Sequence, residues 1–137
     1  MSIDRFQKGM DKLKELTVPD EHSPTGHMEI GESFAEVAPD LKRMVVEFAF
    51  GDVYARPGLE NKQKVLCTIS ALVAQGTPQI GMHVITGLNV GLTPDEIVGC
   101  IMHLIPYVGF PRALNALKVA QEVFKEQGVA ISNTDIE

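Results

Sequence analysis

The chain has 137 residues, of which 45% are hydrophobic, and a formal net charge of −6 at pH 7. This length suits one domain with a buried core, and the composition argues against an intrinsically disordered chain. The acidic balance and the lack of a Lys/Arg cluster argue against nucleic acid or an acidic membrane surface as a partner. No apolar signal segment opens the sequence, so we expect a cytoplasmic protein.

The first half of the chain reads as helices separated by turn-rich stretches. Helical spacing of apolar residues predicts an amphipathic helix over 3–16, followed by a loop in TVPDEHSPTGH. Further helices are predicted at about 28–37, 39–54 and 60–75, the last after the turn ARPGLE. The predicted buried stripe of the 39–54 helix consists of Leu41, Met44, Val45 and Phe48.

Two Thr-Pro pairs predict helix starts in the second half. In GTPQ, Thr77 is the predicted N-cap, and in GLTPDE, Thr93 and Glu96 form a predicted capping box. The glycine before each threonine, Gly76 or Gly91, suits the left-handed end of the preceding helix. The last two helices are predicted to run from 94 to near 109 and from 111 to about 127. No stretch alternates with period two for long, so we predict an all-α fold of about six helices in a single domain, 1–137.

Charge is nearly absent from the middle of the chain. Between Val65 and Pro111 the only Asp, Glu, Lys or Arg residues are Asp95 and Glu96. Turn-rich stretches divide this segment into pieces too short or too polar to span a membrane. Helices that are apolar nearly all round must be covered on every side. We therefore expect a homo-oligomer, with much of residues 65–108 at or near subunit contacts.

Three polar residues share one face of the 94–109 helix. Cys100, His103 and Tyr107 are spaced i, i+3 and i+7, and aliphatic residues occupy the opposite side. This pattern is compatible with the wall of a small pocket. It is equally compatible with a buried polar seam whose hydrogen bonds close on the backbone or on another subunit.

His83 interrupts an apolar helix and allows two interpretations. It is either a core residue with satisfied hydrogen bonds or a general acid–base group, since nearby charges could make it titrate around neutrality. His83 and His103 lack an evident third ligand, so no metal site is predicted. Cys67 and Cys100 form no C-x-x-C and are expected to be reduced thiols. No nucleotide-binding glycine motif is present, so we expect no nucleotide cofactor.

The stretches FGDVYARPGLENKQKVLCTISALVAQG and MHVITGLNVGLTPDEIVGCIMHLIPYVGFPRALNAL resemble the carboxymuconolactone decarboxylase family, part of the alkylhydroperoxidase D-like superfamily. The motifs that carry the resemblance are the RPGL turn, the histidine before N-x-G-[LV]-T-x-x-E-I, and H-x-x-x-Y-x-G-x-P with a later Asn-Ala. The resemblance is strongest over residues 44–120. It leaves an N-terminal helix and loop, 1–27, and a tail, 128–137.

The resemblance implies a small helical subunit, with the alkylhydroperoxidase D-like fold, that assembles into trimers or hexamers. It also implies a decarboxylase of aromatic catabolism that acts on γ-carboxymuconolactone without a cofactor. By this resemblance His83 is the proton donor and Arg56 holds a substrate carboxylate. Glu60 orients a neighbouring group, and His103 and Tyr107 line the pocket.

Departures from the family pattern shape the alternatives. Peroxidase-like members carry C-x-x-C seven and four residues before the histidine, where this chain has Gly76 and Gln79. A thiol-dependent peroxidase is therefore disfavoured, and a non-catalytic oligomer that binds a ligand is a further alternative. In the decarboxylase pattern the histidine is followed by two arginines, and here Ile85 and Leu88 occupy those places. A less charged substrate than the dianionic lactone is therefore expected, and its identity stays open.

Overall fold

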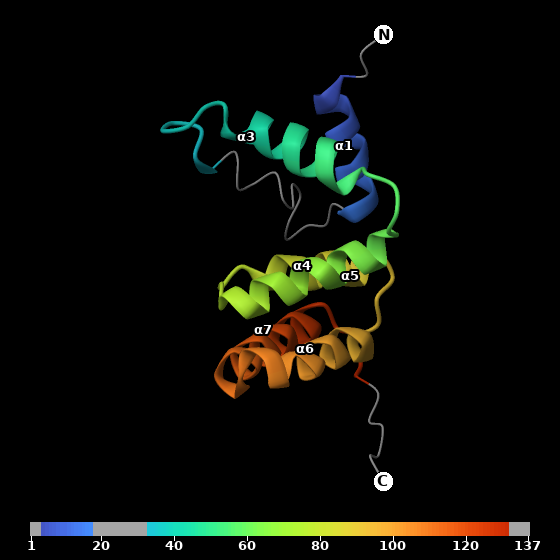
Figure 1. Cartoon of the computed structure of the whole chain (residues 1–137), viewed down its shortest axis with the longest axis vertical. Helices are drawn as coiled ribbons and strands as arrows, with labels where there is room; N and C mark the ends of the chain where they lie inside the picture. Colours follow the sequence, from blue (N-terminus) through green and yellow to red (C-terminus); the bar gives the residue numbers. More distant parts are fainter. Residues whose placement is uncertain (1–3, 18–32, 132–137) are drawn as a thin grey trace. The chain divides into compact units, whose positions relative to one another are not determined.

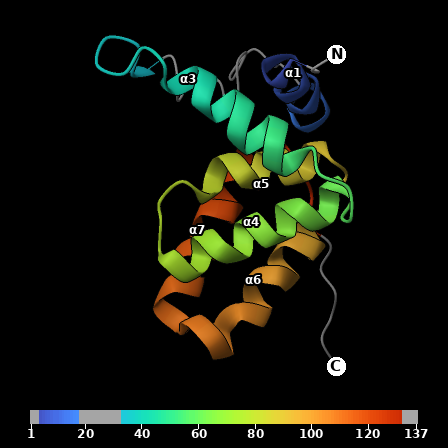
Figure 2. The same ribbon diagram turned by 45° about the horizontal axis from the view of Figure 1, so that its top comes forward.

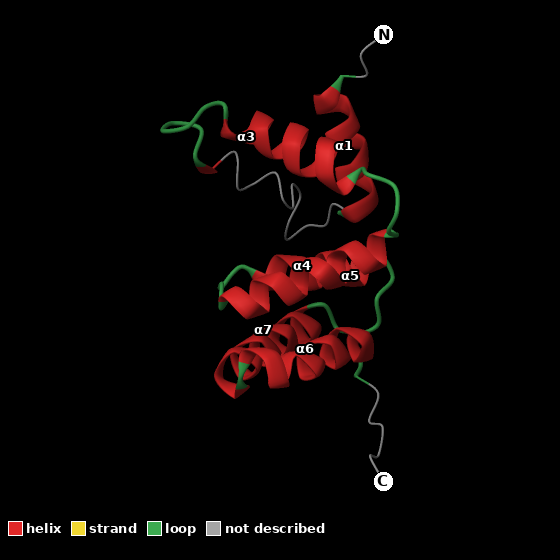
Figure 3. Cartoon of the chain, in the orientation of Figure 1, coloured by secondary structure: helices red, strands yellow, loops and turns green. Residues whose placement is uncertain are grey.

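The computed structural model describes residues 4–17 and 33–131, and within these residues the chain is helical, with no strand (Figure 3). The elements in order are α1 (Arg5–Leu16), α3 (Leu41–Met44), η1 (Val45–Tyr54), α4 (Asn61–Gln75), α5 (Ile80–Asn89), α6 (Pro94–Val108) and α7 (Phe110–Glu126). Because α3 continues directly into η1, the described residues contain six helical segments, which confirms the predicted all-α class. None of these helices is both long and apolar enough to cross a membrane.

The chain divides into two compact units, residues 1–60 and 61–137. In the first unit α1 packs across the continuous helix of α3 and η1 (Figure 1). Arg5 on α1 holds Asp52 on η1 through two hydrogen bonds, from Nε to Oδ1 at 3.1 Å and from Nη2 to Oδ2 at 2.5 Å. Gly9 lies where the two helices approach closely, because a Cβ built on it would overlap the Val46 carbonyl oxygen.

The predicted stripe of the 39–54 helix is wrong in its detail. Val46 and Phe50 are buried, whereas Met44 is 60% exposed and Phe48 is 63% exposed. Residues 45–54 form a π-helix, and the Ala55 amide donates to the Phe50 carbonyl in an i→i+5 bond of 3.1 Å. Val46 and Phe50 are four residues apart, so the buried face keeps a helical spacing but is displaced around the helix from the predicted stripe, towards the contact of Val46 with Gly9.

The predicted helix at 28–37 falls partly outside the described residues. Over 34–37 the chain forms a turn, in which the amides of Val37 and Ala38 both donate to the Phe34 carbonyl. The prediction of one domain over 1–137 stays a prediction.

The second unit is a four-helix arrangement. Helix α4 packs beside α5 and α6, and α7 packs beside the same two helices, as Figures 1 and 2 show from different directions. Five aliphatic side chains at its centre are fully shielded from solvent: Val65, Ile69, Val84, Ile97 and Ile101. Gly87 on α5 makes this packing possible, since a Cβ there would meet Leu92, Ile97 and Val65 at 3.1–3.5 Å.

The two Thr-Pro pairs behave differently. At the start of α6 the predicted capping box is confirmed: Thr93 Oγ1 accepts from the Glu96 amide, and the Glu96 carboxylate accepts from the Thr93 amide. The backbone of Thr93 holds the pKa of Glu96 below its usual value. The predicted cap at Thr77 is wrong, because α5 begins only at Ile80.

The reason lies at the end of α4. Gly76 has a left-handed φ of 69°, its amide donates to the Val73 carbonyl, and the Thr77 amide donates to the Leu72 carbonyl. These are the two bonds of a Schellman motif, in which Thr77 completes α4. The chain then needs a further turn through Pro78 and Gln79 before α5 starts.

We predict that Gly9→Ala destabilises the first unit by about 1–3 kcal/mol, because the added methyl group would press on the η1 backbone. The measurement is the free energy of unfolding by urea, followed by circular dichroism. Gly99→Ala is the control, since a Cβ at Gly99 on α6 meets nothing within 4 Å. It should be neutral or stabilising, by up to about 1 kcal/mol from helix propensity. Equal effects of the two substitutions would contradict the close approach of α1 and η1.

Candidate functional site

His83 lies in the first turn of α5, between the buried residues Ile80 and Val84. It precedes Gly87 by four residues, so it shares a helix face with the glycine that packs against α4 and α6. The imidazole is half-buried, and its Nδ1 atom is shielded from solvent. His83 therefore lies at the edge of the apolar core of the second unit.

Burial lowers the pKa of His83 below its ordinary value of 6.5. Removal from water disfavours the charged imidazolium, so the free protein holds His83 neutral at pH 7. A neutral imidazole can accept a proton, and it can donate one strongly only after it has been protonated. An anionic group placed beside it would favour that protonation by raising the pKa.

The predicted polar stripe of α6 divides into two parts. Cys100 is half-buried and its Sγ lies 3.4 Å from the hydroxyl oxygen of Ser70 on α4. The side chains of His103 and Tyr107 are exposed, and their ring centroids lie 5.8 Å apart at an interplanar angle of 50°. The structure therefore brings His103 and Tyr107 together on the surface of α6, while Cys100 faces α4.

Arg56 and Glu60 follow η1 in the turn that contains the RPGL motif. Both are exposed, and Gly58 between them has a φ of 115°, a left-handed value that favours glycine. This backbone conformation explains why the RPGL turn has a glycine at position 58. Arg56 and Glu60 belong to the first unit, whereas His83, His103 and Tyr107 belong to the second. A common site for the five residues stays a prediction.

Gly76 and Gln79, the positions that hold cysteines in peroxidase-like proteins, lie at the ends of helices in this chain. Gly76 adopts the left-handed φ that ends α4, a conformation that cysteine adopts only with strain, and Gln79 is the exposed N-cap position of α5. The thiol of Cys67 is exposed, and neither cysteine is in a disulfide. Over residues 4–17 and 33–131, no three His, Cys, Asp or Glu side chains are grouped so that they could hold a metal ion.

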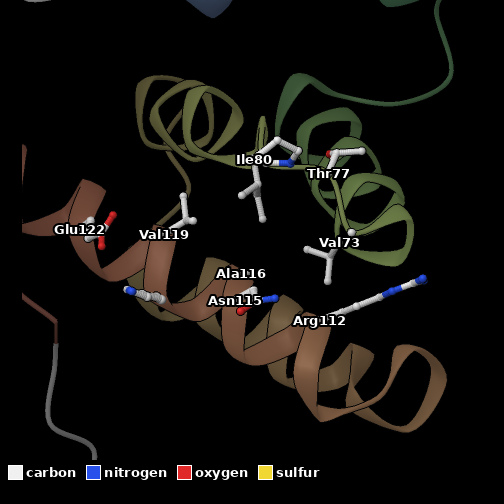
Figure 4. A pocket seen from close by; sticks show the side chains of 11 residues that line it. Val73, Thr77, Ile80, Arg112, Asn115, Ala116, Val119 and Glu122 are labelled. Carbon is white, nitrogen blue, oxygen red and sulfur yellow. The ribbon is translucent and has the colours of Figure 1, made fainter.

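One cavity was not predicted from the sequence. It measures about 380 Å³ and lies where the end of α4 and the start of α5 face α7 (Figure 4). Its polar lining includes Thr77 between α4 and α5, and Arg112, Asn115, Lys118 and Glu122 on α7. Gly76 and Thr77 and the Asn-Ala pair, Asn115 and Ala116, were all noted in the sequence, but they were not predicted to line a common cavity. His83 does not line this cavity.

Comparison with known proteins finds relatives of this chain, two of which are named as decarboxylases. A family model described as the carboxymuconolactone decarboxylase family matches residues 39–122. A 4-carboxymuconolactone decarboxylase of Acinetobacter baylyi is 36% identical over 100 residues, which cover 72% of this chain and 75% of the relative. A nitrosuccinic acid decarboxylase of Metarhizium robertsii is 31% identical over 86 residues, 62% of this chain and 60% of the relative. An uncharacterized 15.0 kDa protein of Paracoccus denitrificans is 31% identical over 125 residues, 89% of either chain.

The lowered pKa of His83 predicts a pH dependence of stability. Below about pH 6.5 the unfolded chain binds a proton at His83 that the folded chain resists, so the free energy of unfolding falls as the pH falls. Above that pH His83 is neutral in both the folded and the unfolded chain, so this loss of stability is absent. In His83→Gln this part of the loss should disappear. The measurement is urea unfolding of both proteins between about pH 7.5 and 5. Parallel curves for the two proteins would contradict the desolvation of His83.

Proposed function

The chain belongs to the carboxymuconolactone decarboxylase family, and on that premise we propose that it is a cofactor-free lyase or isomerase. Its substrate is a small carboxylate or lactone, and its mechanism is general acid–base catalysis. The observation that carries the proposal is that the matched segment, 39–122, contains a half-buried histidine, His83, at the edge of the core. The names of two relatives, which describe loss of CO₂ from small carboxylic acids, support the reaction class.

The proposed reaction replaces a carboxylate by a proton. The bond between the carboxylate and its carbon breaks, CO₂ leaves, and the electron pair passes to an electron-withdrawing part of the substrate. A proton is then delivered to the carbon skeleton, and the enzyme recovers that proton from water. The protein must therefore supply an acid near the reacting carbon and keep water from competing for the carbanion-like product.

His83 is the proposed acid. In the free protein it is neutral, since burial lowers its pKa. An anionic substrate bound beside it would stabilise the imidazolium, so substrate binding and proton uptake are coupled. His83 therefore carries its proton when the substrate carboxylate that will leave as CO₂ is bound.

The remaining residues are proposed in the roles that the family resemblance implies. Arg56 binds a carboxylate, Glu60 orients a neighbouring group, and His103 and Tyr107 contact the substrate. Ile85 and Leu88 are half-buried aliphatic residues and offer no charge to a second carboxylate. We therefore propose a substrate with a single negative charge near His83, in preference to a dianion.

We also propose that the chain forms a homo-oligomer through α6 and α7. These two helices expose four large apolar side chains in the isolated chain: Met102, Tyr107, Phe110 and Leu114, between 50% and 75% exposed. Large apolar surfaces of this kind are typical of sites that another protein covers. A second copy of the chain is the occupant that the near absence of charge between residues 65 and 111 favours.

The activity prediction concerns His83 and pH. Assayed on γ-carboxymuconolactone and on a panel of uncharged and singly charged lactones, the wild type should turn over at least one, most readily a singly charged one. His83→Ala should lower kcat by about 10²–10⁴-fold, the usual contribution of a general acid. Because the imidazolium is the active form, kcat/KM should rise as the pH falls through the range near and below 6.5.

Folding of His83→Ala is the control for this experiment, measured by circular dichroism and thermal unfolding. A folded variant that retains full turnover would contradict the catalytic role. A kcat/KM that falls with falling pH would assign His83 as a base instead of an acid. No turnover of any compound in the panel would contradict the proposed enzyme class.

The oligomer prediction is tested by size-exclusion chromatography with light scattering. The wild type should elute with a mass that is a multiple of the 15.0 kDa chain mass. Leu114→Glu places a charge in the exposed apolar surface of α7 and should shift the protein towards the single-chain mass. Gln127→Glu adds the same charge at the exposed C-cap of α7, thirteen residues from Leu114, and should leave the mass unchanged. A monodisperse wild type of 15.0 kDa would contradict the proposal.

A further inference from the structure

We propose that the cavity at the corner of α4 and α5 is a second binding site, which takes a small organic monocarboxylate with an apolar body. In this proposal Arg112, Asn115 and the Thr77 hydroxyl bind the carboxylate end. The site goes beyond the proposed decarboxylation, because His83 does not line it and none of its lining residues has a part in that mechanism.

The cavity has the size and lining of a small-molecule site. Its volume of about 380 Å³ is within the usual range for such sites, which begins near 300 Å³. Four aliphatic residues from α4, α5 and α7 form an apolar lining: Val73, Ile80, Ala116 and Val119. Figure 4 shows these side chains on both sides of the space, with the Asn115 amide between them. The cavity can therefore hold an apolar body while polar groups contact one end of it.

The Thr77 hydroxyl points to a missing partner. Its Oγ1 atom is buried and has no hydrogen-bond partner among the described residues. Thr77 does not cap α5, because its backbone completes the Schellman motif of α4. A buried hydroxyl without a partner is unfavourable, so such groups in native proteins are usually bonded to water or to a ligand. Thr77 lines the cavity, where a ligand oxygen could accept its hydrogen bond.

Arg112 supplies a positive charge that is already held in position. Its Nη1 donates to the Ala74 carbonyl at the end of α4, and its Nε lies 3.4 Å from the place of a Cβ on Gly76. The absence of a side chain at Gly76 leaves room for the guanidinium. A guanidinium has five N–H donors, so donors remain for a carboxylate after the bond to Ala74. The residue is thus fixed by the fold before any ligand arrives.

The charges along α7 orient the ligand. Arg112 and Glu122 lie at opposite ends of the cavity (Figure 4), ten residues or about 15 Å apart along the helix. Lys118 also lines the cavity, one turn before Glu122, and the Glu122 carboxylate offsets its positive charge. Arg112 is therefore the cation that is left for the carboxylate of the ligand. The apolar lining between the two favours an organic anion over inorganic phosphate or sulfate.

The probe for this site is benzoate, compared with benzamide, which has the same size and no charge. Isothermal titration of the full chain should show saturable binding of benzoate, with benzamide about tenfold or more weaker. The backbone amide resonances that benzoate shifts should cluster in residues 76–80 and 112–122. His83→Ala should keep this binding, so a failure of the proposed decarboxylation leaves the result unaffected.

Two variants test the named groups. Thr77→Val removes only the buried hydroxyl, so without ligand it should have an unchanged or higher Tm, and it should bind benzoate several-fold more weakly. Thr86→Val is its matched control: the Thr86 hydroxyl donates to the Met82 carbonyl at 3.1 Å, outside the cavity, and benzoate binding should be unchanged. Arg112→Gln should abolish benzoate binding.

Several results would overturn the proposal. These are equal affinities for benzoate and benzamide, resonance shifts that cluster away from residues 76–80 and 112–122, or an unchanged benzoate affinity in Arg112→Gln. Since Arg112 also binds the end of α4, Arg112→Gln could lose its fold. In that event Thr77→Val decides the matter: an unchanged benzoate affinity in this variant overturns the proposal.

Discussion

The burial of α5 against α4 and α6 is the constraint on which the second unit depends. With almost no charge between residues 65 and 111, these helices gain stability by covering one another, and Gly87 lets them approach closely. His83 stands one turn from that contact, so the packing that holds the unit together also removes water from the imidazole. Burial in the core is therefore enough to explain why the pKa of the candidate acid is lowered, and no nearby charge is needed.

This origin has a consequence for the substrate. A histidine whose pKa is lowered by burial becomes a stronger proton donor once it is charged, but it needs an anion nearby to become charged. In a site with arginines at positions 85 and 88, permanent cations would bind the carboxylates and would also oppose protonation of His83. With Ile85 and Leu88 in those places, a single substrate carboxylate can interact with the imidazolium directly. The absence of arginines at positions 85 and 88 is thus compatible with the proposed role of His83 as an acid.

The features that could be predicted from the sequence are those fixed by neighbours along the chain. The capping box of Thr93 and Glu96 and the left-handed glycines Gly76 and Gly91 depend on a few adjacent residues, and all were predicted. The cap at Thr77 failed because two local motifs compete for one residue, and the end of α4 takes it. The predicted stripe of the 39–54 helix was wrong because this helix carries apolar residues on more than one side, and the packing of α1 decides that Val46 and Phe50 are the buried ones. The cavity combines Thr77 with Arg112 across 35 positions of sequence, so only the tertiary packing of α7 creates it.

The two proposed sites require cations of different kinds. A binding site is best served by a charge that is always present, as a guanidinium provides. The Arg112 guanidinium donates a hydrogen bond to the Ala74 carbonyl, which holds it in position. A proton donor must instead change its charge in each turnover, which an imidazole at the edge of the core can do and a guanidinium cannot. The chain has twelve lysine and arginine residues and none between 65 and 111. Anion binding and proton donation are therefore proposed for different residues. The permanent cation of the proposed second site, Arg112 on α7, is held against the end of α4, and the titratable group of the proposed active site, His83, lies on α5, where burial lowers its pKa.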